Sequence, residues 1–581
     1  MKETSMQPGD SRNEKTWNLL IELTDLFALY SLLIIFVYDI RLISSAKETA
    51  WVDLFFDDAY YYMGITRNIV ERHLSSFLPP FETNGYQPLW LILLSLSASI
   101  FGTGLHSIPI QMHLVALFFI LSFFALSKKE NGFGFPTILC GLFMPIIMMT
   151  GLETVMLPTL FLLFIKCDYW KKRGICGSLL FLARLDALSV VIARDLFIWI
   201  RGQKNDFKHY LYILPVVFIY FVFNYIYFGT PVPVSGLAKF IGNHIGENTV
   251  SVVNWLMVFK YPLSAFLLMV YVLLALQKKI AGAPFFNEIS ILLIATLICM
   301  IYYALFSGWP IWPWYLWGPF LIVYYLVLQA FTLFREMFIA HTFFGRKIYC
   351  KNFILLLGLL LAPAAPLGAT FVFVHNKISH PYQFAHFNGQ ATSPTWETKN
   401  VELVEWIKTQ HIPENSFFAM GDRSGAFGYF LGNKYRFLQT EGLVGSYEYI
   451  RALKNDDAEN YIKNLKIDYW VADREEFLED GDQIGVIEPV QGASAHIGPY
   501  LICFSRRGIL LNQSYSLKGA EPQKRYLFSG KYQVQCTNKL KNEFRTLRQK
   551  YNGIRSQAFP LHRPIPSRKR CPNQRIQHKK G

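Results

Sequence analysis

Residues 289–306 read ISILLIATLICMIYYALF, a run that contains no charged side chain. A helix of about 20 apolar residues spans the hydrocarbon core of a bilayer, so this run predicts a transmembrane helix. Further apolar runs predict spans on both sides of it: Leu26–Ile43, Ile108–Leu126, Phe133–Met149, Thr154–Ile165, Tyr210–Phe228, Trp255–Leu276, Trp317–Phe334 and Phe353–Val374. The sequence therefore predicts a polytopic membrane protein.

The composition supports this class. The 581 residues are 52% hydrophobic and only 17% charged, which is too little charge for the surface of a soluble chain of this length. The net charge of +15 is concentrated at the C-terminus, since the residues from Gly519 onward include sixteen Lys/Arg and two Glu. In a membrane protein, such a tail is more typical of disorder or lipid-headgroup contact than of nucleic-acid binding. No nucleic-acid partner is expected.

The positions of Lys and Arg predict the topology, because these residues accumulate in cytoplasmic loops. The prediction requires Pro88–Phe101 to be a peripheral or re-entrant helix, and Ile175–Ile200 to be a broken pair around Arg184–Asp186. About eleven spans then result, in the cytoplasmic (inner) membrane, with the C-terminus outside. The predicted outer stretches are Ser44–His106, Thr150–Glu153, Gly229–Val253, Ser307–Trp314 and everything after His375.

The chain is predicted to have three parts. Residues 1–375 form the transmembrane bundle, which is all-α and includes the first outer loop at 44–106. Residues 376–518 alternate amphipathic helical stretches, among them Tyr447–Leu465, with short strand-like runs, which indicates a small extracytoplasmic α/β domain. Residues 519–581 are basic and aperiodic, which predicts a disordered tail.

The first outer loop combines acidic and aromatic residues. It includes Asp57 and Asp58, followed by tyrosines. A glycosyl transfer needs a carboxylate to take the acceptor proton and cationic groups to hold a phosphate leaving group. An alternative reading is an N-cap, because acids favour the start of the helix that begins near Ala59. Adjacent helical residues point roughly 100° apart, so both carboxylates are not expected to face one atom.

Five motifs in order resemble those of a bacterial and archaeal family of GT-C-fold glycosyltransferases, whose first outer loop carries DDAY…ARN…GYTxPLW. The resemblance covers roughly residues 20–475, and further stretches after these motifs look like the family's C-terminal region. The matching segments are Asp57–Tyr61 with Arg67–Asn68, Asn84–Trp90, Thr150–Thr154 (SGLET), Leu182–Asp186 (LARPDG) and Asn224–Pro233 (NYxYFGxPLP) with Ala238–Lys239.

The resemblance implies an inverting enzyme of the cell envelope, similar to mannosyltransferases, that transfers a hexosyl or pentosyl group from a polyprenyl-phosphate sugar. Asp57 matches the first acid of the family's pair, Asp58 is the alternative base, and Glu153 matches the acid at the second outer turn. The acceptor would be a glycan, a lipid or a protein, and membrane lipids would surround the bundle. No cofactor or metal is required, although Asp57 with Glu153 leaves a divalent cation open.

Other residues are candidates for substrate binding. Arg67 and Lys239 are candidates for the phosphate, with an anchor to lipid headgroups as the alternative for each. Arg184 is either a substrate ligand or the partner of Asp186. Aromatic faces suit a sugar ring, and the candidates for this contact are Tyr60, Tyr86 and Trp90. A further aromatic cluster, which is as typical of an interfacial belt as of a sugar site, consists of Trp309, Trp312, Trp314 and Tyr315.

The rival prediction from another class is a transporter or flippase of lipid-linked sugars. Broken helices and a polar cavity would suit this function as well. The halves of the sequence show no internal repeat, and most of the acids crowd the outer loops rather than the middle of the spans. A scaffold without activity is a further alternative, against which the intact acids Asp57, Asp58 and Glu153 argue.

Overall fold

The computed structural model describes residues 11–45, 47–131, 151–204, 206–241, 286–307, 313–339, 396–409, 412–421, 423–455, 457–472 and five short strands or strand segments between 484 and 529. The chain divides into two compact units, Met1–Gln535 and Cys536–Gly581, and every described residue belongs to the first. The predicted spans at 133–149, 255–276 and 353–374 lie outside the described residues, as do Trp309 and Trp312.

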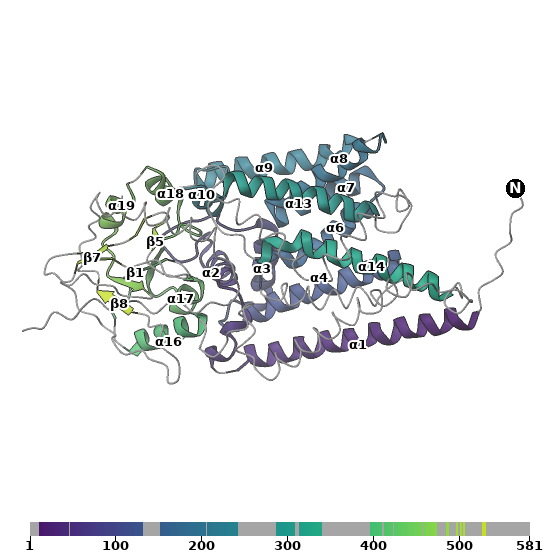
Figure 1. The fold of residues 1–581 in the computed structure, drawn as a ribbon. Helices are drawn as coiled ribbons and strands as arrows, with labels where there is room; N and C mark the ends of the chain where they lie inside the picture. Colours follow the sequence, from purple (N-terminus) through teal and green to yellow (C-terminus); the bar gives the residue numbers. More distant parts are fainter. Residues whose placement is uncertain are drawn as a thin grey trace, which may run out of the picture. The chain divides into compact units, whose positions relative to one another are not determined.

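The first part of the chain is a bundle of helices (Figure 1). Among the described residues, three stretches are long and apolar enough to cross a membrane, namely Ser107–Ser127, Phe207–Phe228 and Phe286–Phe306. The chain is therefore a helical membrane protein, while its number of spans and its sidedness stay predictions. The helices of the bundle are α1 (Ser11–Ile43), α4 (Ser107–Asn131), α6 (Leu157–Lys166), α7 (Trp170–Ala183), α8 (Leu188–Ile200), α9 (Tyr210–Phe228), α13 (Phe286–Phe306) and α14 (Trp317–Ile339).

Two features of the helices concern the stretches on which the topology prediction depends, while the topology itself stays a prediction. Helix α7 ends at Ala183, and α8 begins at Leu188 after an extended Arg184 and a short 3₁₀ turn. Helix α3 (Pro88–Phe101) has 14 residues and would span only about 21 Å, which is shorter than the bilayer core. The 3₁₀ turns are η1 (Glu48–Ala50), η2 (Val52–Leu54), η3 (Glu153–Met156), η4 (Leu185–Ala187), η5 (Phe207–His209) and η7 (Pro313–Leu316).

The later part of the chain contains a four-stranded sheet in the order β2-β1-β3-β8. Strand β1 (Phe417–Met420) is parallel to β2 (Arg436–Gln439) and β3 (Tyr469–Ala472), whereas β8 (Tyr526–Ser529) is antiparallel to β3. Parallel neighbours need crossover connections, and helices supply them here. Helix α17 (Gly425–Leu431) lies between β1 and β2, and α18 (Tyr447–Lys454) and α19 (Ala458–Leu465) lie between β2 and β3, while α16 (Trp396–Thr409) precedes β1.

This sheet refines the sequence-based expectation. The helix expected at 447–465 is divided into α18 and α19, and β8 comes from the stretch expected to be a disordered tail. Two further strand pairs are β4 (Ile484–Val486) with β7 (Cys503–Ser505), and β5 (His496–Ile497) with β6 (Tyr500–Leu501). The domain boundaries at 375 and 518 stay predictions, since both positions lie outside the described residues.

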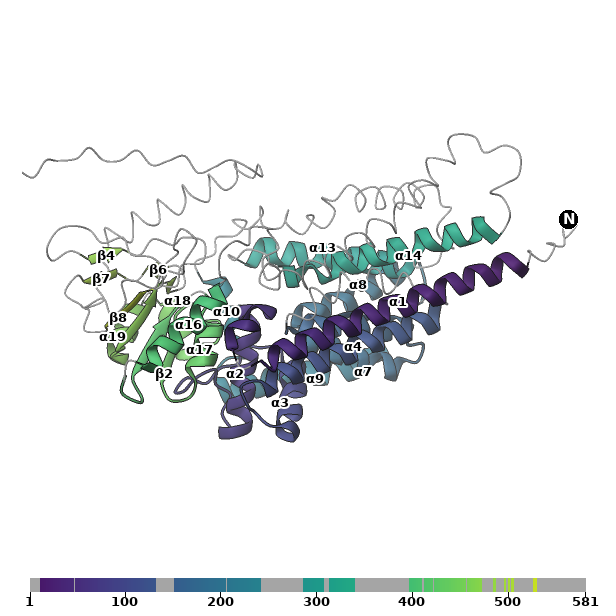
Figure 2. The same cartoon turned by 90° about the horizontal axis from the view of Figure 1, so that it is seen from below.

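Helix α2 (Asp57–Arg72) joins the two parts, because it packs against both α3 and α17 (Figures 1 and 2). One cluster of buried apolar side chains continues from the helices of the bundle, through Tyr60 on α2, to Phe427 and Tyr429 on α17. A second cluster packs α10 (Val234–Phe240) against α18. The first outer loop and the C-terminal part therefore share a core.

Candidate active site

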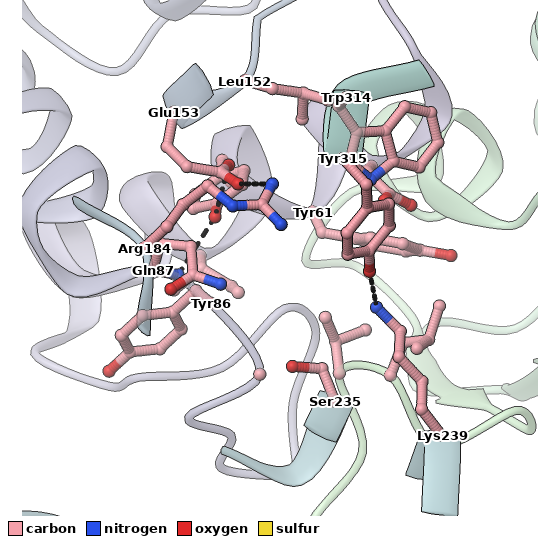
Figure 3. Close-up of a pocket in the computed structure, with 16 residues that line it drawn as sticks. Tyr61, Tyr86, Gln87, Leu152, Glu153, Arg184, Ser235, Lys239, Trp314 and Tyr315 are labelled. Atoms are coloured by element: carbon pink, nitrogen blue, oxygen red, sulfur yellow. Dashed lines mark hydrogen bonds and ion pairs between the residues drawn. The ribbon is translucent and has the colours of Figure 1, made fainter. Parts of the chain in front are cut away.

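A cavity lies where α2, the chain around Glu153 and Arg184, α10, η7 and the C-terminal part meet (Figure 3). It encloses about 580 Å³, part of which is open to solvent. Its lining consists of Asp58, Tyr61, Tyr62, Ile65, Gly85, Tyr86, Gln87, Leu152, Glu153, Arg184, Ser235, Lys239, Trp314, Tyr315, Leu443 and Val444.

Helix α2 contributes one face to this cavity. Its lining residues are Asp58, Tyr61, Tyr62 and Ile65, which follow the i, i+3, i+4, i+7 spacing of one helical stripe. Both Asp57 and Asp58 lie in the first turn of α2, where the helix dipole favours negative charge, and the N-cap position of this helix is Phe56. Of these two acids, Asp58 lines the cavity and Asp57 does not.

Glu153 and Arg184 form a buried network on one side of the cavity (Figure 3). Arg184 Nη1 lies 3.1 Å from Glu153 Oε1, and Arg184 Nε and Nη2 each donate to Asp186 at 2.9 Å. Tyr62 donates to Glu153 Oε2 at 3.0 Å, and Tyr303 donates to Asp186 Oδ2 at 3.1 Å. One guanidinium is therefore held between two carboxylates, which fixes the direction of Glu153 and balances the charge of Arg184.

Lys239, Tyr315 and Trp314 lie on the other side of the cavity (Figure 3). Lys239 Nζ donates to the hydroxyl of Tyr315, and the Arg184 guanidinium lies 4.8 Å from the centre of the Tyr315 ring. Burial lowers the pKa of Lys239, but the oxygen of Tyr315 and the carboxylate of Asp58 raise it, and the result is a pKa above the ordinary value. The Lys239 ammonium is thus charged within the cavity.

Asn84 positions the helix that carries Lys239. Its side-chain oxygen accepts the backbone N–H of Val234, the first residue of α10, at 2.9 Å. Its amide nitrogen donates to the side chain of Asn224 at the end of α9 at 2.8 Å. Two of the motifs found in the sequence, in the first outer loop and around residues 224–233, are therefore in direct contact and place Lys239.

Five of the nine candidate site residues lie together in the cavity, namely Asp58, Tyr86, Glu153, Arg184 and Lys239. The predicted pairing of Arg184 with Asp186 is present, and Arg184 contacts Glu153 in addition. Asp57, Tyr60, Arg67 and Trp90 do not line the cavity. Each of these four has a structural partner elsewhere.

Asp57 faces the C-terminal part. Its Oδ2 accepts the backbone N–H of Gly425 at 2.9 Å, and its Oδ1 accepts that of Ala426 at 3.0 Å. These are the first amides of α17, which have no acceptor within their own helix. The expected capping role of this carboxylate is thus observed at another helix, far away in sequence.

Arg67 also faces the C-terminal part and does not line the cavity. Its Nη2 donates to the carbonyl oxygen of Tyr429 at 3.3 Å, and its guanidinium lies 4.9 Å from the centre of the Tyr429 ring. Tyr60 and Trp90 are fully buried, and they donate to the backbone carbonyls of Val52 and Gly151. These aromatic rings pack in the core and leave no face for a sugar.

Sequence reasoning missed several residues of the cavity. Tyr61 and Tyr62 belong to the helical stripe that starts at Asp58, so the spacing identifies them once Asp58 is known to line the cavity. Leu443 and Val444 belong to a different part of the chain, and no local pattern connects them with Asp58. Among the described residues, no group of three or more His, Cys, Asp or Glu side chains is placed to hold a metal ion.

Comparison with known proteins gives limited results. No family model matches the chain, and no curated protein matches it. Among solved structures, it is similar to ArnT from Cupriavidus metallidurans, which was crystallised bound to undecaprenyl phosphate, with 11% sequence identity and a TM-score of 0.47. The match covers 87% of this chain and 97% of that chain.

Proposed function

We propose that the chain is an inverting glycosyltransferase of the GT-C type, which transfers a hexosyl or pentosyl group from a polyprenyl phosphate to an acceptor hydroxyl. The observation that carries the proposal is the meeting of carboxylates and cations across one cavity. Asp58 and Glu153 face the same space as Arg184 and Lys239. This transfer requires a base for the acceptor and positive charge for the departing phosphate.

Asp58 is proposed as the general base. It takes the proton of the acceptor hydroxyl while the oxygen attacks the anomeric carbon from the face opposite the phosphate. The bond between the anomeric carbon and the phosphate oxygen breaks, and polyprenyl phosphate leaves with the electron pair. One displacement of this kind inverts the configuration of the sugar.

Lys239 is proposed as the group that holds the phosphate. Arg184 pairs with two carboxylates, those of Glu153 and Asp186, whereas Lys239 donates to the hydroxyl of Tyr315 and is influenced by one nearby carboxylate, that of Asp58. Lys239 therefore offers more net positive charge to an incoming phosphate than Arg184 does. Arg184 is assigned the task of holding Glu153 in the cavity, and Tyr61, Tyr62 and Trp314 offer aromatic surface to the sugar.

The reaction is proposed to take place on the outer face of the cytoplasmic membrane, with the C-terminal part on the same side. The acceptor, whether glycan, lipid or protein, would reach the cavity from that side. The support for this location is the distribution of basic loops along the sequence, which predicts a cytoplasmic position for the opposite ends of the helices.

The test is the turnover of labelled polyprenyl-phosphate sugars by membranes that contain wild type, Asp58→Asn or Asp57→Asn at equal expression. Wild type should consume at least one donor of a broad panel, and Asp58→Asn should lower the rate by roughly 100-fold or more, as expected for a lost general base. If Asp58→Asn turns over like wild type, the assignment of the base is wrong. If wild type consumes no donor, the enzyme proposal fails and lipid translocation becomes the next assay.

A further inference from the structure

Helix α2 presents two different surfaces. The stripe of Asp58, Tyr61, Tyr62 and Ile65 lines the cavity. Another side of the helix is fastened to the C-terminal part through Asp57 and Arg67, and at the last turn Arg72 donates to the carbonyl oxygen of Asn433 at 3.5 Å. The helix that carries the proposed base is thus also the docking element for the C-terminal part.

The contact between Asp57 and Gly425 leaves no room for a side chain at position 425. A Cβ atom added to Gly425 would lie 2.2 Å from the backbone oxygen of Asp57. Beside this contact, the hydroxyl of Tyr61, which lines the cavity, lies 3.2 Å from Ser424 Oγ. The start of α17 is therefore fitted to the start of α2.

The C-terminal part also forms one wall of the cavity, through Leu443 and Val444. This wall approaches the first outer loop closely, since a Cβ atom on Gly85 would lie 1.9 Å from the carbonyl oxygen of Leu443. The wall is held by Gln439 at the end of β2, whose Oε1 accepts the backbone N–H of Leu443 at 2.9 Å. Both side chains of the wall are apolar, so it suits a non-ionic surface rather than a phosphate.

We infer that Asp57 is a positioning residue, which docks the start of α17 on α2 and thereby holds the Leu443–Val444 wall against the acceptor. The inference rests on the proposed function, because the acceptor belongs to that reaction. Asp57 acts through backbone amides of α17 and takes no proton from the substrate. The C-terminal part then helps to determine which acceptor the enzyme uses.

The first measurement does not depend on activity. Hydrogen exchange of a peptide that covers residues 423–431 is compared in the full-length wild type, Asp57→Ala, Asp57→Asn and the control Glu82→Gln, which alters an exposed carboxylate of the same outer loop. The amides of Gly425 and Ala426 have no acceptor within α17, so their protection reports on Asp57. Exchange should be roughly tenfold faster in Asp57→Ala, intermediate in Asp57→Asn and unchanged in Glu82→Gln. Unchanged exchange in Asp57→Ala would overturn the docking role.

The second measurement is steady-state kinetics with the same variants. Asp57→Ala should raise the KM for the acceptor about fivefold to tenfold, with kcat within about threefold of wild type and an unaltered pH profile. Glu82→Gln should retain both constants. A 100-fold loss of kcat in both Asp57 variants would make Asp57 the base and overturn the inference. If wild type has no turnover, the proposed function fails, and the exchange result alone decides whether Asp57 docks α17.

Discussion

Asp57 and Asp58 are neighbours in sequence that face different surroundings. Successive residues of an α-helix point about 100° apart, so the two carboxylates of α2 cannot share one target. Asp58 faces the cavity, whereas Asp57 binds two backbone amides of α17. The two adjacent acids therefore have different proposed roles, Asp58 as the base and Asp57 as the docking residue.

Arg184 offers a test of the buried charge network. Arg184→Met leaves Glu153 and Asp186 as neighbouring buried carboxylates without a cation between them, which should destabilise the protein by about 3–5 kcal/mol. Glu153→Gln leaves Arg184 paired with Asp186 and should cost about 1–2 kcal/mol. Thermal unfolding of the detergent-purified variants measures this order. Equal stability of the two variants would contradict it.

The site residues that the sequence could identify are those with a local signal. Asp58 was found because acidic and aromatic residues alternate just after the first apolar span, whereas Glu153 and Lys239 were found through the resemblance of their segments to family motifs. The role of Asp57 could not be found in this way, because its partner Gly425 is 368 positions away, and Arg67 contacts Tyr429 at a separation of 362. Tertiary packing decides which face of α2 lines the cavity, and the local spacing of the residues does not indicate this face.

At the scale of elements, α2 carries three consecutive buried tyrosines, Tyr60, Tyr61 and Tyr62. Each hydroxyl has a hydrogen-bond partner, at Val52, Ser424 and Glu153 respectively. Burial, together with nearby carboxylates such as Glu153 beside Tyr62, raises the pKa of all three phenols well above the ordinary value. They therefore stay neutral, and Tyr62 stays a donor to Glu153.

These tyrosines predict a loss of stability at alkaline pH. Above about pH 10 the unfolded chain releases phenol protons that the folded chain retains, so the free energy of unfolding falls by about 1.4 kcal/mol per pH unit for each such group. The contribution is fully present below pH 10 and is lost as the pH rises towards the raised folded pKa. Between pH 9 and pH 11, the thermal midpoint of Tyr62→Phe should fall less than that of wild type. An equal fall in the two proteins would contradict this account.

The elements themselves were largely predictable. Apolar runs without charge gave α4, α9 and α13, and the break at Arg184 followed from charge in the middle of an apolar stretch. Strand β8 was missed because its sequence, Tyr526–Ser529, is short and surrounded by basic and polar residues. Its place in the sheet comes from pairing with β3, a contact between distant segments that no local pattern indicates.

At the scale of the whole molecule, the cavity is assembled from segments between Asp58 and Val444. The bundle supplies the charged groups Glu153 and Arg184, α10 supplies Lys239, and the C-terminal part supplies an apolar wall. A polyprenyl phosphate likewise has an ionic phosphate group and an apolar chain, and the chain would lie among the spans. The arrangement suits a ligand that enters from the membrane and meets its acceptor at the C-terminal part.

This division predicts how the lipid binds when no reaction takes place. A polyprenyl phosphate without sugar should bind wild type in detergent, and Lys239→Met should weaken binding by about tenfold to 100-fold, since a charge-assisted hydrogen bond is worth roughly 1.5–3 kcal/mol. Lys239→Arg should retain part of the affinity, and Lys454→Met, at an exposed position of α18, should bind like wild type. The dissociation constant is measured by the ligand-dependent shift of the unfolding midpoint, which any ligand selective for the folded state produces. Equal affinity of wild type and Lys239→Met would show that Lys239 does not bind the phosphate. The proposed orientation of the donor in the cavity would then be wrong.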